Sequence, residues 1–409
     1  MKVLQVNNVY RKGSTGKIVY DLHSILEEEG IESVVCYGRG QKENQENIYK
    51  TSSELLAKYN NLNSRISGLH YNGSWFATNK LLNIIKKEKP DIVHLQCING
   101  YFVNIYRLLN YLKKNNIKTV LTLHAEFMYT GSYDHIFHDE KQHRYNNYRE
   151  FRTLTKSYFF DRYKKAWFKM NKSLSNFESL RIVAVSDFLR ERAQNSQIMS
   201  SYSVKVIENG IETENTFKPS LSSQITLKNK LGLKDEKIII HVTAKFTLNE
   251  NDNKGGHYVV QLAKMLLEEN IKIIVIGATN LTLDLPKNII NIGKTNNQEE
   301  LAEYYSLGDL TLITSKRETF SMVCAESLSC GTPVVGFKAG GPETISLPEF
   351  SKFIDYGNLQ ILKQTVINWI NLKSNLQPDE ISKIARENYS RQKMGQKYIE
   401  LYNELNQMK

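Results

Sequence analysis

The chain has 409 residues, of which 41% are apolar and 24% charged, and its formal net charge is +11. A chain of this length exceeds what one compact core usually supports, so the sequence predicts two domains. The composition is typical of a soluble protein, and no run approaches the roughly 18 apolar residues of a membrane-spanning helix.

The first residues are expected to form a strand over 2–6. Lysine and asparagine interrupt this apolar run early, which is not the pattern of a secretory signal. The four cysteines form no CxxC pair and lie in apolar runs, so we expect them to be reduced. These observations favour a cytoplasmic protein without a disulfide framework or a zinc site.

A polar loop containing Gly13 and Gly16 follows the first strand and leads into a helix expected at 17–29. The loop superficially resembles a P-loop, but Arg11 replaces the required first glycine and Ile18 replaces the serine or threonine after the lysine. Glycines at the carboxyl edge of a parallel sheet still let the backbone approach a ligand closely. Helix packing alone also explains them.

Strand-like and helix-like segments then alternate, which predicts an α/β protein with parallel sheets. Two doubly wound Rossmann-like halves account for this pattern economically, with a polar linker at 206–219 between them. Strands of the first half are expected at 33–37, 91–96, 119–123 and 182–185. Strands of the second half are expected at 238–244, 273–276, 289–292, 310–313 and 333–336. A helical stretch is expected at 381–408.

Two histidines lie in or directly after expected strands of the first half. His124 directly follows a strand and should lie at its carboxyl end, whereas His94 is expected in the middle of a strand with a structural role. His135, His138 and His143 gather near two aspartates, but they lack the regular spacing of metal ligands. We therefore predict no metal site.

The region 141–172 is strongly basic and rich in aromatic residues. Such a surface suits an anionic membrane or a nucleic acid, and a solvated helix with a buried aromatic stripe would show the same pattern. We predict contact with an anionic membrane surface through Lys164, Lys165 and Lys169, and no binding of nucleic acid.

Two features of the second half suit a bound phosphorylated sugar. Lys245 and Lys254 follow its first strand, and cations there could neutralise a diphosphate leaving group. Glu318 and Glu326 flank a turn and a helix start, expected at 321–330, where amides hold phosphate and carboxylates accept hydrogen bonds from sugar hydroxyls. Surface lysines and an ordinary βαβ unit with solvated acids would give the same spacing.

The segment from Glu318 to Glu326 matches the E-x7-E motif of retaining nucleotide-sugar transferases, and the chain resembles glycosyltransferase family 4. Segments 331–335 and 340–344 are similar to the continuation of this motif, and 206–219 to the linker between the two domains of that family. Segments 91–96 and 99–101 resemble the subgroup that builds bacterial exopolysaccharides and capsules.

The resemblance implies the GT-B fold, in which two Rossmann-like domains face a cleft. It implies an acceptor-side domain over 1–205, a donor-binding domain over 206–385, and a helix over 386–409 that crosses back to the first domain. No cofactor and no metal are expected, and the donor substrate is a nucleoside diphosphate sugar.

The resemblance also assigns roles to single residues. His124, Glu318 and Lys254 correspond to catalytic positions, with His124 beside the donor sugar and Glu326 on the ribose hydroxyls. The family has an arginine where this chain has Lys245, and 247–253 lengthens the gap before Lys254. The implied donor-binding residues are Gly16, Lys245, Lys254, Glu318, Thr319, Phe320, Ser321, Met322 and Glu326.

The function implied is retaining transfer of a sugar, with UDP as the expected nucleotide, to a glycan or lipid-linked acceptor in cell-surface polysaccharide synthesis. The enzyme is expected on the cytoplasmic face of the membrane. One alternative is a non-catalytic glycan- or membrane-binding module of the same fold, which the intact acidic and basic positions disfavour. The other is a different nucleotide-sugar enzyme of this fold, such as an epimerase or a phosphorylase.

Overall fold

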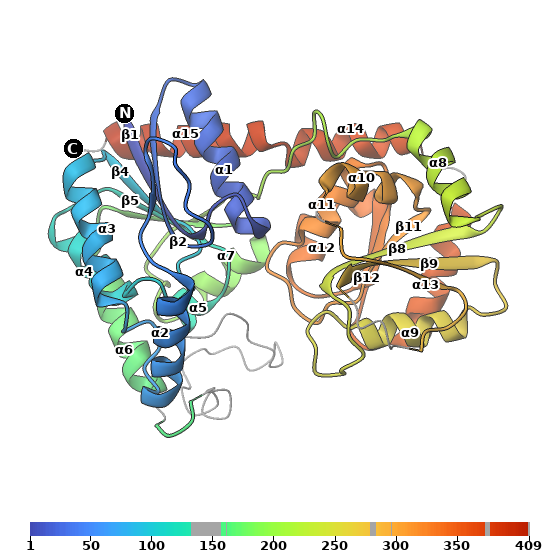
Figure 1. Cartoon of the computed structure of the whole chain (residues 1–409), viewed down its shortest axis with the longest axis horizontal. Coiled ribbons are helices and arrows are strands. Elements are labelled where there is room, and N and C mark those ends of the chain that lie inside the picture. Colours follow the sequence, from blue (N-terminus) through green and yellow to red (C-terminus); the bar gives the residue numbers. More distant parts are fainter. Residues whose placement is uncertain (132–156, 161, 279–283, 296, 373–376, 408–409) are drawn as a thin grey trace. The chain divides into compact units, whose positions relative to one another are not determined.

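The computed structural model describes residues 1–131, 157–160, 162–278, 284–295, 297–372 and 377–407. The chain divides into two compact units (Figure 1). Unit 1 consists of Met1–Glu208 together with Met394–Lys409, and unit 2 of Asn209–Lys393. None of the helices in the described part of the chain is both long and apolar enough to cross a membrane.

Unit 1 is built on a seven-stranded parallel sheet with the order β3-β2-β1-β4-β5-β6-β7. The predicted parallel arrangement is confirmed, and the three-residue edge strand β3 was not predicted because so short a run carries no periodic signal. The strands are β1 (Lys2–Val9), β2 (Glu32–Arg39), β3 (Ile48–Lys50), β4 (Ile92–Leu95), β5 (Thr119–Leu123), β6 (Leu180–Ala184) and β7 (Val204–Val206).

The helices of unit 1 cover both faces of this sheet, as βαβ crossovers require (Figure 1). They are α1 (Gly13–Glu28), α2 (Glu54–Ser67), α3 (Trp75–Glu88), α4 (Ile105–Lys114), α5 (Phe127–Thr130), α6 (Tyr163–Leu174), α7 (Asp187–Gln194) and α15 (Arg391–Gln407). The first helix begins at Gly13 and not at Lys17 as predicted. The expected glycine loop is therefore largely the first turn of α1.

Unit 2 has a six-stranded parallel sheet with the order β10-β9-β8-β11-β12-β13. Its strands are β8 (Lys237–Lys245), β9 (Ile271–Ala278), β10 (Ile289–Gly293), β11 (Leu310–Ile313), β12 (Val334–Phe337) and β13 (Ser351–Ile354). Its helices are α8 (Leu221–Leu231), α9 (Gly256–Met265), α10 (Gln298–Leu307), α11 (Met322–Ser329), α12 (Gly341–Ile345), α13 (Leu359–Leu372) and α14 (Pro378–Tyr389).

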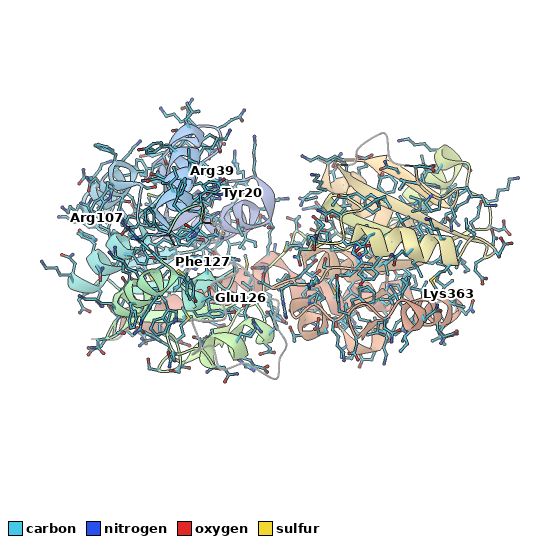
Figure 2. The ribbon with its side chains drawn as sticks, turned by 90° about the horizontal axis from the view of Figure 1, so that it is seen from below. Tyr20, Arg39, Arg107, Glu126, Phe127 and Lys363 are labelled. Carbon is cyan, nitrogen blue, oxygen red and sulfur yellow. The ribbon has the colours of Figure 1, made fainter. Side chains whose placement is uncertain are left out.

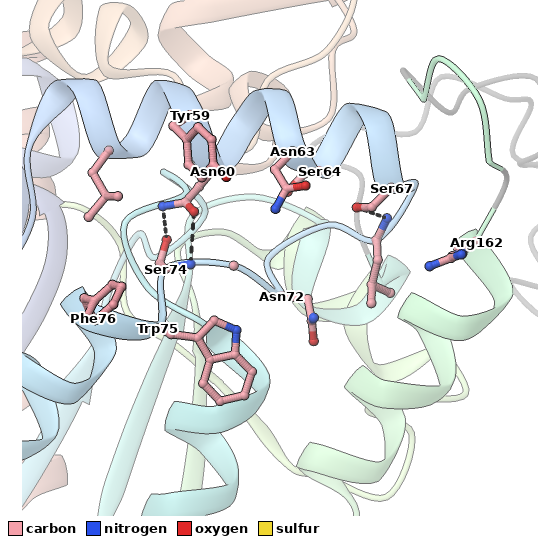
Figure 3. Close-up of a pocket in the computed structure, with 13 residues that line it drawn as sticks. Tyr59, Asn60, Asn63, Ser64, Ser67, Asn72, Ser74, Trp75, Phe76 and Arg162 are labelled. Carbon is pink, nitrogen blue, oxygen red and sulfur yellow. Dashed lines mark hydrogen bonds between the residues drawn. The ribbon is translucent and has the colours of Figure 1, made fainter.

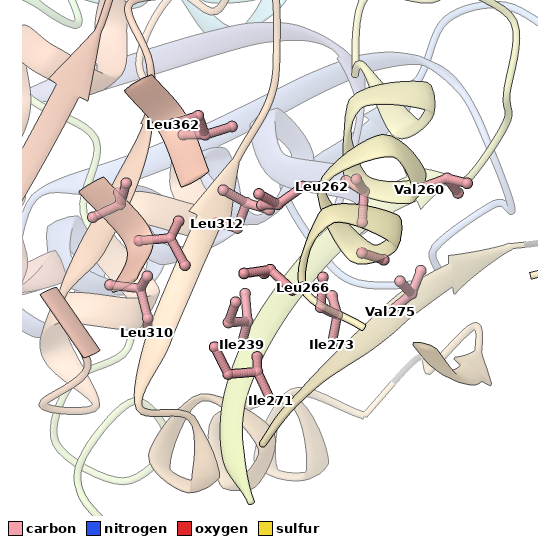
Figure 4. Packing of buried hydrophobic residues seen from close by; sticks show 14 of the residues in the cluster. Ile239, Val260, Leu262, Leu266, Ile271, Ile273, Val275, Leu310, Leu312 and Leu362 are labelled. Atoms are coloured by element: carbon pink, nitrogen blue, oxygen red, sulfur yellow. The ribbon is translucent and has the colours of Figure 1, made fainter. Parts of the chain in front are cut away.

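The core of unit 2 lies between this sheet and the helices α9 and α13. Ile239, Ile273 and Leu312 project from three neighbouring strands onto Leu262 and Leu362 of those helices (Figure 4). All five side chains are fully or almost fully buried. This layer holds the carboxyl ends of β8 and β11 in place, and those ends lead into the segments that carry Lys254 and Glu318.

The C-terminal stretch is helical, as predicted over 381–408, but it is divided into two helices. It consists of α14 and α15, which are separated at Ser390. The backbone of Ser390 bridges to Ile211 of unit 2, which interrupts the helical hydrogen bonding. Beyond this break, α15 packs on unit 1, where Tyr398, Leu401 and Leu405 join the apolar cluster that includes residues of α1.

Candidate active site

The segment that connects β11 to α11 places Glu318 in a compact polar cluster. Its Oε1 accepts hydrogen bonds from Lys254 Nζ at 2.8 Å and from Ser315 Oγ at 2.5 Å. The Glu318 side chain is only 11% exposed, while that of Lys254 is 41% exposed. The carboxylate is thus held by protein donors, and the ammonium group reaches solvent beside it.

Electrostatics keep the Glu318 side chain ionised. Burial alone would raise the pKa of this carboxyl, but the positive charge and hydrogen bond of Lys254 and the hydroxyl of Ser315 outweigh that effect. The net result is a lowered pKa. The Ser321 hydroxyl contributes in the same direction, although it lacks the geometry of a full hydrogen bond.

The backbone around Glu318 is fixed against the glycine-rich start of α12. Glu318 N donates to Ala339 O at 2.9 Å, and Gly341 N donates to Glu318 O at 2.8 Å. A Cβ atom on Gly341 would lie 2.5 Å from the backbone nitrogen of Phe320, so this position admits only glycine without a shift. The turn over 318–320 is therefore positioned by a close backbone contact.

Ser321, which precedes α11, has an unusual backbone conformation. Its φ of 89° lies in the left-handed region, which a serine rarely adopts. Strain of this kind persists only where surrounding contacts enforce it, and it is common at ligand sites. Thr319, Phe320, Ser321 and Met322 together form the turn and the first helical residue, with Phe320 and Ser321 buried.

Glu326 does not lie near the start of α11, as the sequence had led us to expect, but in its second turn. It is almost fully buried, and its Oε2 accepts a hydrogen bond from Tyr305 Oη at 3.0 Å. Burial, reinforced by the nearby Glu326 carboxylate, raises the pKa of the Tyr305 hydroxyl and keeps that group a proton donor. A carboxylate has about four acceptor sites, and this hydrogen bond uses one of them.

The two lysines predicted for the donor site differ in their surroundings. Lys245 is the last residue of β8 and is exposed. The loop at Lys254 is anchored, because Thr314 Oγ1 donates to Lys254 O at 2.9 Å and Gly255 takes a φ of 67° directly against Thr314. The structure thus brings Lys254 to Glu318.

Two supporting residues were missed by sequence reasoning. Ser315 stands three positions before Glu318, and Asn253 accepts from Lys316 N at 2.8 Å and donates to Arg317 O at 2.7 Å. Asn253 belongs to the stretch that appeared to be only a lengthened gap. No sequence signal separates it from the other asparagines there, because its role depends on a contact between distant segments.

In unit 1, Gly16 and His124 both belong to segments that follow carboxyl ends of strands. A Cβ on Gly16 would lie 3.1 Å from Val9 Cγ2 and 3.3 Å from Arg11 N, so glycine allows α1 to approach β1 closely. His124 Nε2 donates to Gln96 Oε1 at 2.8 Å, and burial lowers the pKa of its imidazole to about 4. His124 is therefore neutral at physiological pH.

His94 has the structural role predicted for it. It is fully buried in β4, with Nδ1 2.6 Å from Tyr402 Oη and Nε2 2.8 Å from Thr122 Oγ1. Burial lowers the pKa of this imidazole to about 3. The residue ties α15 to the centre of the sheet.

A second buried contact fixes the chain just after His124. Glu126 accepts hydrogen bonds from Arg192 of α7, with Arg192 Nη2 2.8 Å from Glu126 Oε2, and both side chains are buried. Glu126 and its neighbour Phe127 are labelled in Figure 2. Breaking a buried ion pair of this type is costly, so it is a strong constraint on the segment after β5.

The lysines of α6 are not equivalent. Lys164 and Lys165 are exposed, but Lys169 donates to Asn72 Oδ1 and lies 5.1 Å from the centre of the Tyr106 ring. Burial lowers the pKa of Lys169. Lys169 is therefore directed into unit 1 and not outward like the other two.

Metal binding finds no support in the described part of the chain, where no three acidic, histidine or cysteine side chains form a group that could hold an ion. The histidines at 135, 138 and 143 lie outside the described residues.

Two family models match successive parts of the chain. Residues 15–215 match Glycosyltransferase Family 4, and residues 223–388 match Glycosyl transferases group 1. The chain is 21% identical to the putative colanic acid biosynthesis glycosyl transferase WcaC of Escherichia coli, covering 99% of this chain and 100% of that relative. Over 154 residues it is 31% identical to the N-acetyl-alpha-D-glucosaminyl L-malate synthase of Bacillus anthracis, covering 35% of this chain and 38% of the relative.

The coverage differs between relatives. In the malate synthase and in two others at 26% and 27% identity, the chain spans less than half of the relative's own length. The solved structure of HepE from Anabaena in complex with UDP has a TM-score of 0.65 and 16% identity, covering 99% of this chain and 100% of that one. The two domain matches fall on the two Rossmann-like units in turn, and the chain therefore belongs to glycosyltransferase family 4, with the GT-B fold.

Proposed function

We propose that this protein transfers a sugar from a nucleoside diphosphate donor with retention of the anomeric configuration, and that the nucleotide is UDP. The observation that carries the proposal is the cluster of Lys254, Glu318 and Ser315 directly before α11. An ionised carboxylate for sugar hydroxyls, a cation for a diphosphate and a helix start are thereby brought together in unit 2. The UDP bound to HepE supports the choice of nucleotide.

The acceptor we propose is a glycan or a lipid-linked oligosaccharide of a cell-surface polysaccharide. Support comes from the colanic acid name of the relative that matches over its full length. Other relatives are named for malate and for inositol 3-phosphate, so the family accommodates different acceptors. We place the donor on unit 2 and the acceptor on unit 1.

The proposed reaction proceeds on one face of the sugar. The bond between the anomeric carbon and the donor phosphate oxygen breaks, and the acceptor oxygen forms the new bond on the same side. The acceptor proton passes to an oxygen of the departing phosphate. Lys254, with the turn 319–322, stabilises the charge on the diphosphate, while Glu318 and His124 orient the sugar.

Within this proposal, Glu326 accepts hydrogen bonds from the ribose hydroxyls, and Gly16 and Lys245 lie near the diphosphate. The reaction uses no cofactor and no metal ion. We also propose that the enzyme works on the cytoplasmic membrane surface, to which Lys164 and Lys165 contribute positive charge. Lys169 is left out of that surface because it is directed toward Asn72.

The proposal is tested by incubating the protein with UDP-sugars and following the anomeric carbon by NMR. A product with the donor's configuration supports retention, and an inverted product would refute it. A thermal-shift screen of nucleotide sugars comes first, since a ligand at about 100 times its dissociation constant adds about 2.7 kcal/mol of stability. Hydrolysis of a donor in the absence of acceptor separates an enzyme from a non-catalytic binding module.

The role of Glu318 is tested separately with a slow fluorinated donor. Front-face retention predicts that no glycosyl ester accumulates, because hydrogen bonds from Lys254 and Ser315 engage the Glu318 carboxylate at Oε1. Mass spectrometry of the intact protein provides the measurement. A mass increase equal to one sugar, located on Glu318, would establish double displacement instead.

A further inference from the structure

Helix α2 has a row of large apolar side chains that are exposed to solvent and face away from the core of unit 1. These residues recur every three or four positions, which places them on one face of a helix. They are Leu55, Tyr59, Leu62 and Ile66. All four are exposed, Leu55 to 80% and Leu62 to 50%, whereas Ala57, Asn60 and Ser64 on the opposite side are buried.

Neighbouring segments extend this apolar face. Phe76 at the start of α3 is 84% exposed. The neighbouring Trp75 makes a cation–π contact with Arg107, whose guanidinium carbon lies 4.9 Å from the centre of the indole ring. Phe160 is exposed, and its carbonyl lies directly against Gly68 at the end of α2. The α2 patch comprises Leu55, Tyr59, Leu62, Ile66, Trp75, Phe76 and Phe160. It holds seven of the thirteen exposed large apolar side chains in the described part of the chain.

A cavity of about 400 Å³ with both polar and apolar lining opens beside the patch (Figure 3). Asn63 and Ser67 reach it from α2, Asn72 lies across from them, and Arg162 points toward it from one side. Tyr59, Trp75 and Phe76 of the patch also line it. The cavity thus combines amide and hydroxyl groups, one guanidinium and an apolar rim.

Among the described residues, several positive charges lie around the patch. Helical geometry places Lys58 and Arg65 along the edge of the apolar row away from the cavity. Helix α6 contributes Lys164 and Lys165, and its sequence contains no acidic residue. The only acidic residue of α2, Glu54, is paired with Arg39 at 2.7 Å.

We propose that the α2 patch and its cavity form a docking site for an anionic lipid bilayer, with a lipid phosphate seated beside Arg162. This deepens the proposed function, since it identifies the surface that would hold the enzyme at its acceptor. A helix with an apolar face, basic flanks and aromatic side chains has the pattern of an interfacial helix. A second copy of the chain suits the patch less well, because a twofold contact would bring the basic edges together.

The apolar part of the site is tested with the full-length double variant Leu62→Ser/Ile66→Ser. The control is Ile361→Ser, which changes an apolar side chain that is 51% exposed on α13 of unit 2. Binding is measured by co-sedimentation with vesicles of phosphatidylcholine, alone and mixed with phosphatidylglycerol. The double variant should bind the mixed vesicles about tenfold more weakly than wild type, and the control should bind like wild type.

The cavity is tested with Arg162→Gln, which should reduce the preference for phosphatidylglycerol over phosphatidylcholine, and Arg162→Lys should restore part of it. Donor hydrolysis in vesicle-free solution should be unchanged in all these variants. Wild-type protein that ignores mixed vesicles at low salt would overturn the inference. So would a self-association in ultracentrifugation that the double variant abolishes while vesicle binding persists. Vesicle binding without any donor hydrolysis would refute the proposed function alone.

Discussion

At the residue scale, the contact between Lys254 and Glu318 is the most informative feature of unit 2. It pairs a half-exposed cation with a nearly buried carboxylate whose pKa is lowered. An ordinary surface ion pair contributes at most about 1 kcal/mol to stability. A catalytic cation contributes mainly to the transition state, so activity and stability should respond differently to its removal.

Lys254→Ala should lower kcat by about 100-fold or more, because positioned charges on a leaving group supply several kcal/mol. The melting temperature should change by only a few degrees. The matched control is Lys338→Ala, which removes a lysine of unit 2 that pairs with Asp355 at the same 2.8 Å. Near-normal turnover in Lys254→Ala would show that other groups stabilise the diphosphate.

Glu326→Ala should weaken UDP binding by about 1.5–3 kcal/mol, the usual range for a hydrogen bond to a charged group. Titration calorimetry measures this directly. Tyr305→Phe is the matched control, since it removes the hydrogen bond from Tyr305 to Glu326 and leaves the carboxylate in place. Equal UDP affinity in wild type and Glu326→Ala would rule out a ribose contact.

The lowered pKa values of three buried histidines predict how the free energy of unfolding depends on pH. The pKa values of His94, His124 and His241 are lowered by burial to about 3, 4 and 4, below the unfolded value near 6.5. Between about pH 4 and 6.5 the unfolded chain therefore binds more protons, and the free energy of unfolding falls as the pH is lowered. Each histidine contributes up to about 1.4 kcal/mol per pH unit in this window, which urea titrations at several pH values would reveal. A stability that is constant from pH 7 to 5 would contradict these values.

At the element scale, the turn before α11 depends on its contact with the start of α12. Gly341→Ala would place a Cβ 2.5 Å from the Phe320 nitrogen, so the turn 318–320 must move. We expect weaker donor binding and lower turnover, because a displacement of about 1 Å at a reacting centre can cost 100-fold. Gly232→Ala is the control for backbone strain alone, since its φ of 65° disfavours alanine while no atom lies within 4 Å of its Cβ position. It should lower stability and leave the kinetics unchanged. Unaltered kinetics in Gly341→Ala would mean that the turn is not part of the site.

The last helix provides a second prediction at this scale. Helix α15 contributes Met394, Tyr398, Leu401, Tyr402 and Leu405 to the apolar cluster of unit 1. Removing residues 391–409 exposes that cluster and leaves the buried imidazole of His94 without the Tyr402 hydroxyl. Unit 1 should then unfold or aggregate, while unit 2 should keep a cooperative transition in calorimetry. A truncated protein that retains both transitions would contradict a structural role for α15.

At the scale of the whole molecule, each Rossmann-like unit carries candidate residues on the carboxyl side of its own sheet. In unit 2 these are Lys254 and Glu318, and in unit 1 they are Gly16 and His124, each in a segment that follows a strand. Ligands of doubly wound folds bind at this edge because side chains and helix starts collect there. The α2 patch adds a surface of unit 1 on which the proposed enzyme would meet its membrane.

The sequence by itself determined the fold class, the positions of most central strands and the structural role of His94. Apolar runs such as 119–123 and 310–313 became β5 and β11 with those same bounds, since buried parallel strands carry a continuous apolar signal. The motif around Glu318 also indicated glycosyltransferase family 4. Local pattern was sufficient for these features because they depend on residues close together in the chain.

Only the tertiary structure decided the contacts between distant segments. It brought Ser315, Asn253 and Lys254 around the turn of Glu318, and it directed Lys169 inward to Asn72. It broke the C-terminal helix at Ser390, where the backbone bridges to Ile211. It also left the apolar face of α2 exposed, although periodicity alone would have buried it. Periodicity predicts that a helix has an apolar face, but the packing of the whole unit decides what covers that face.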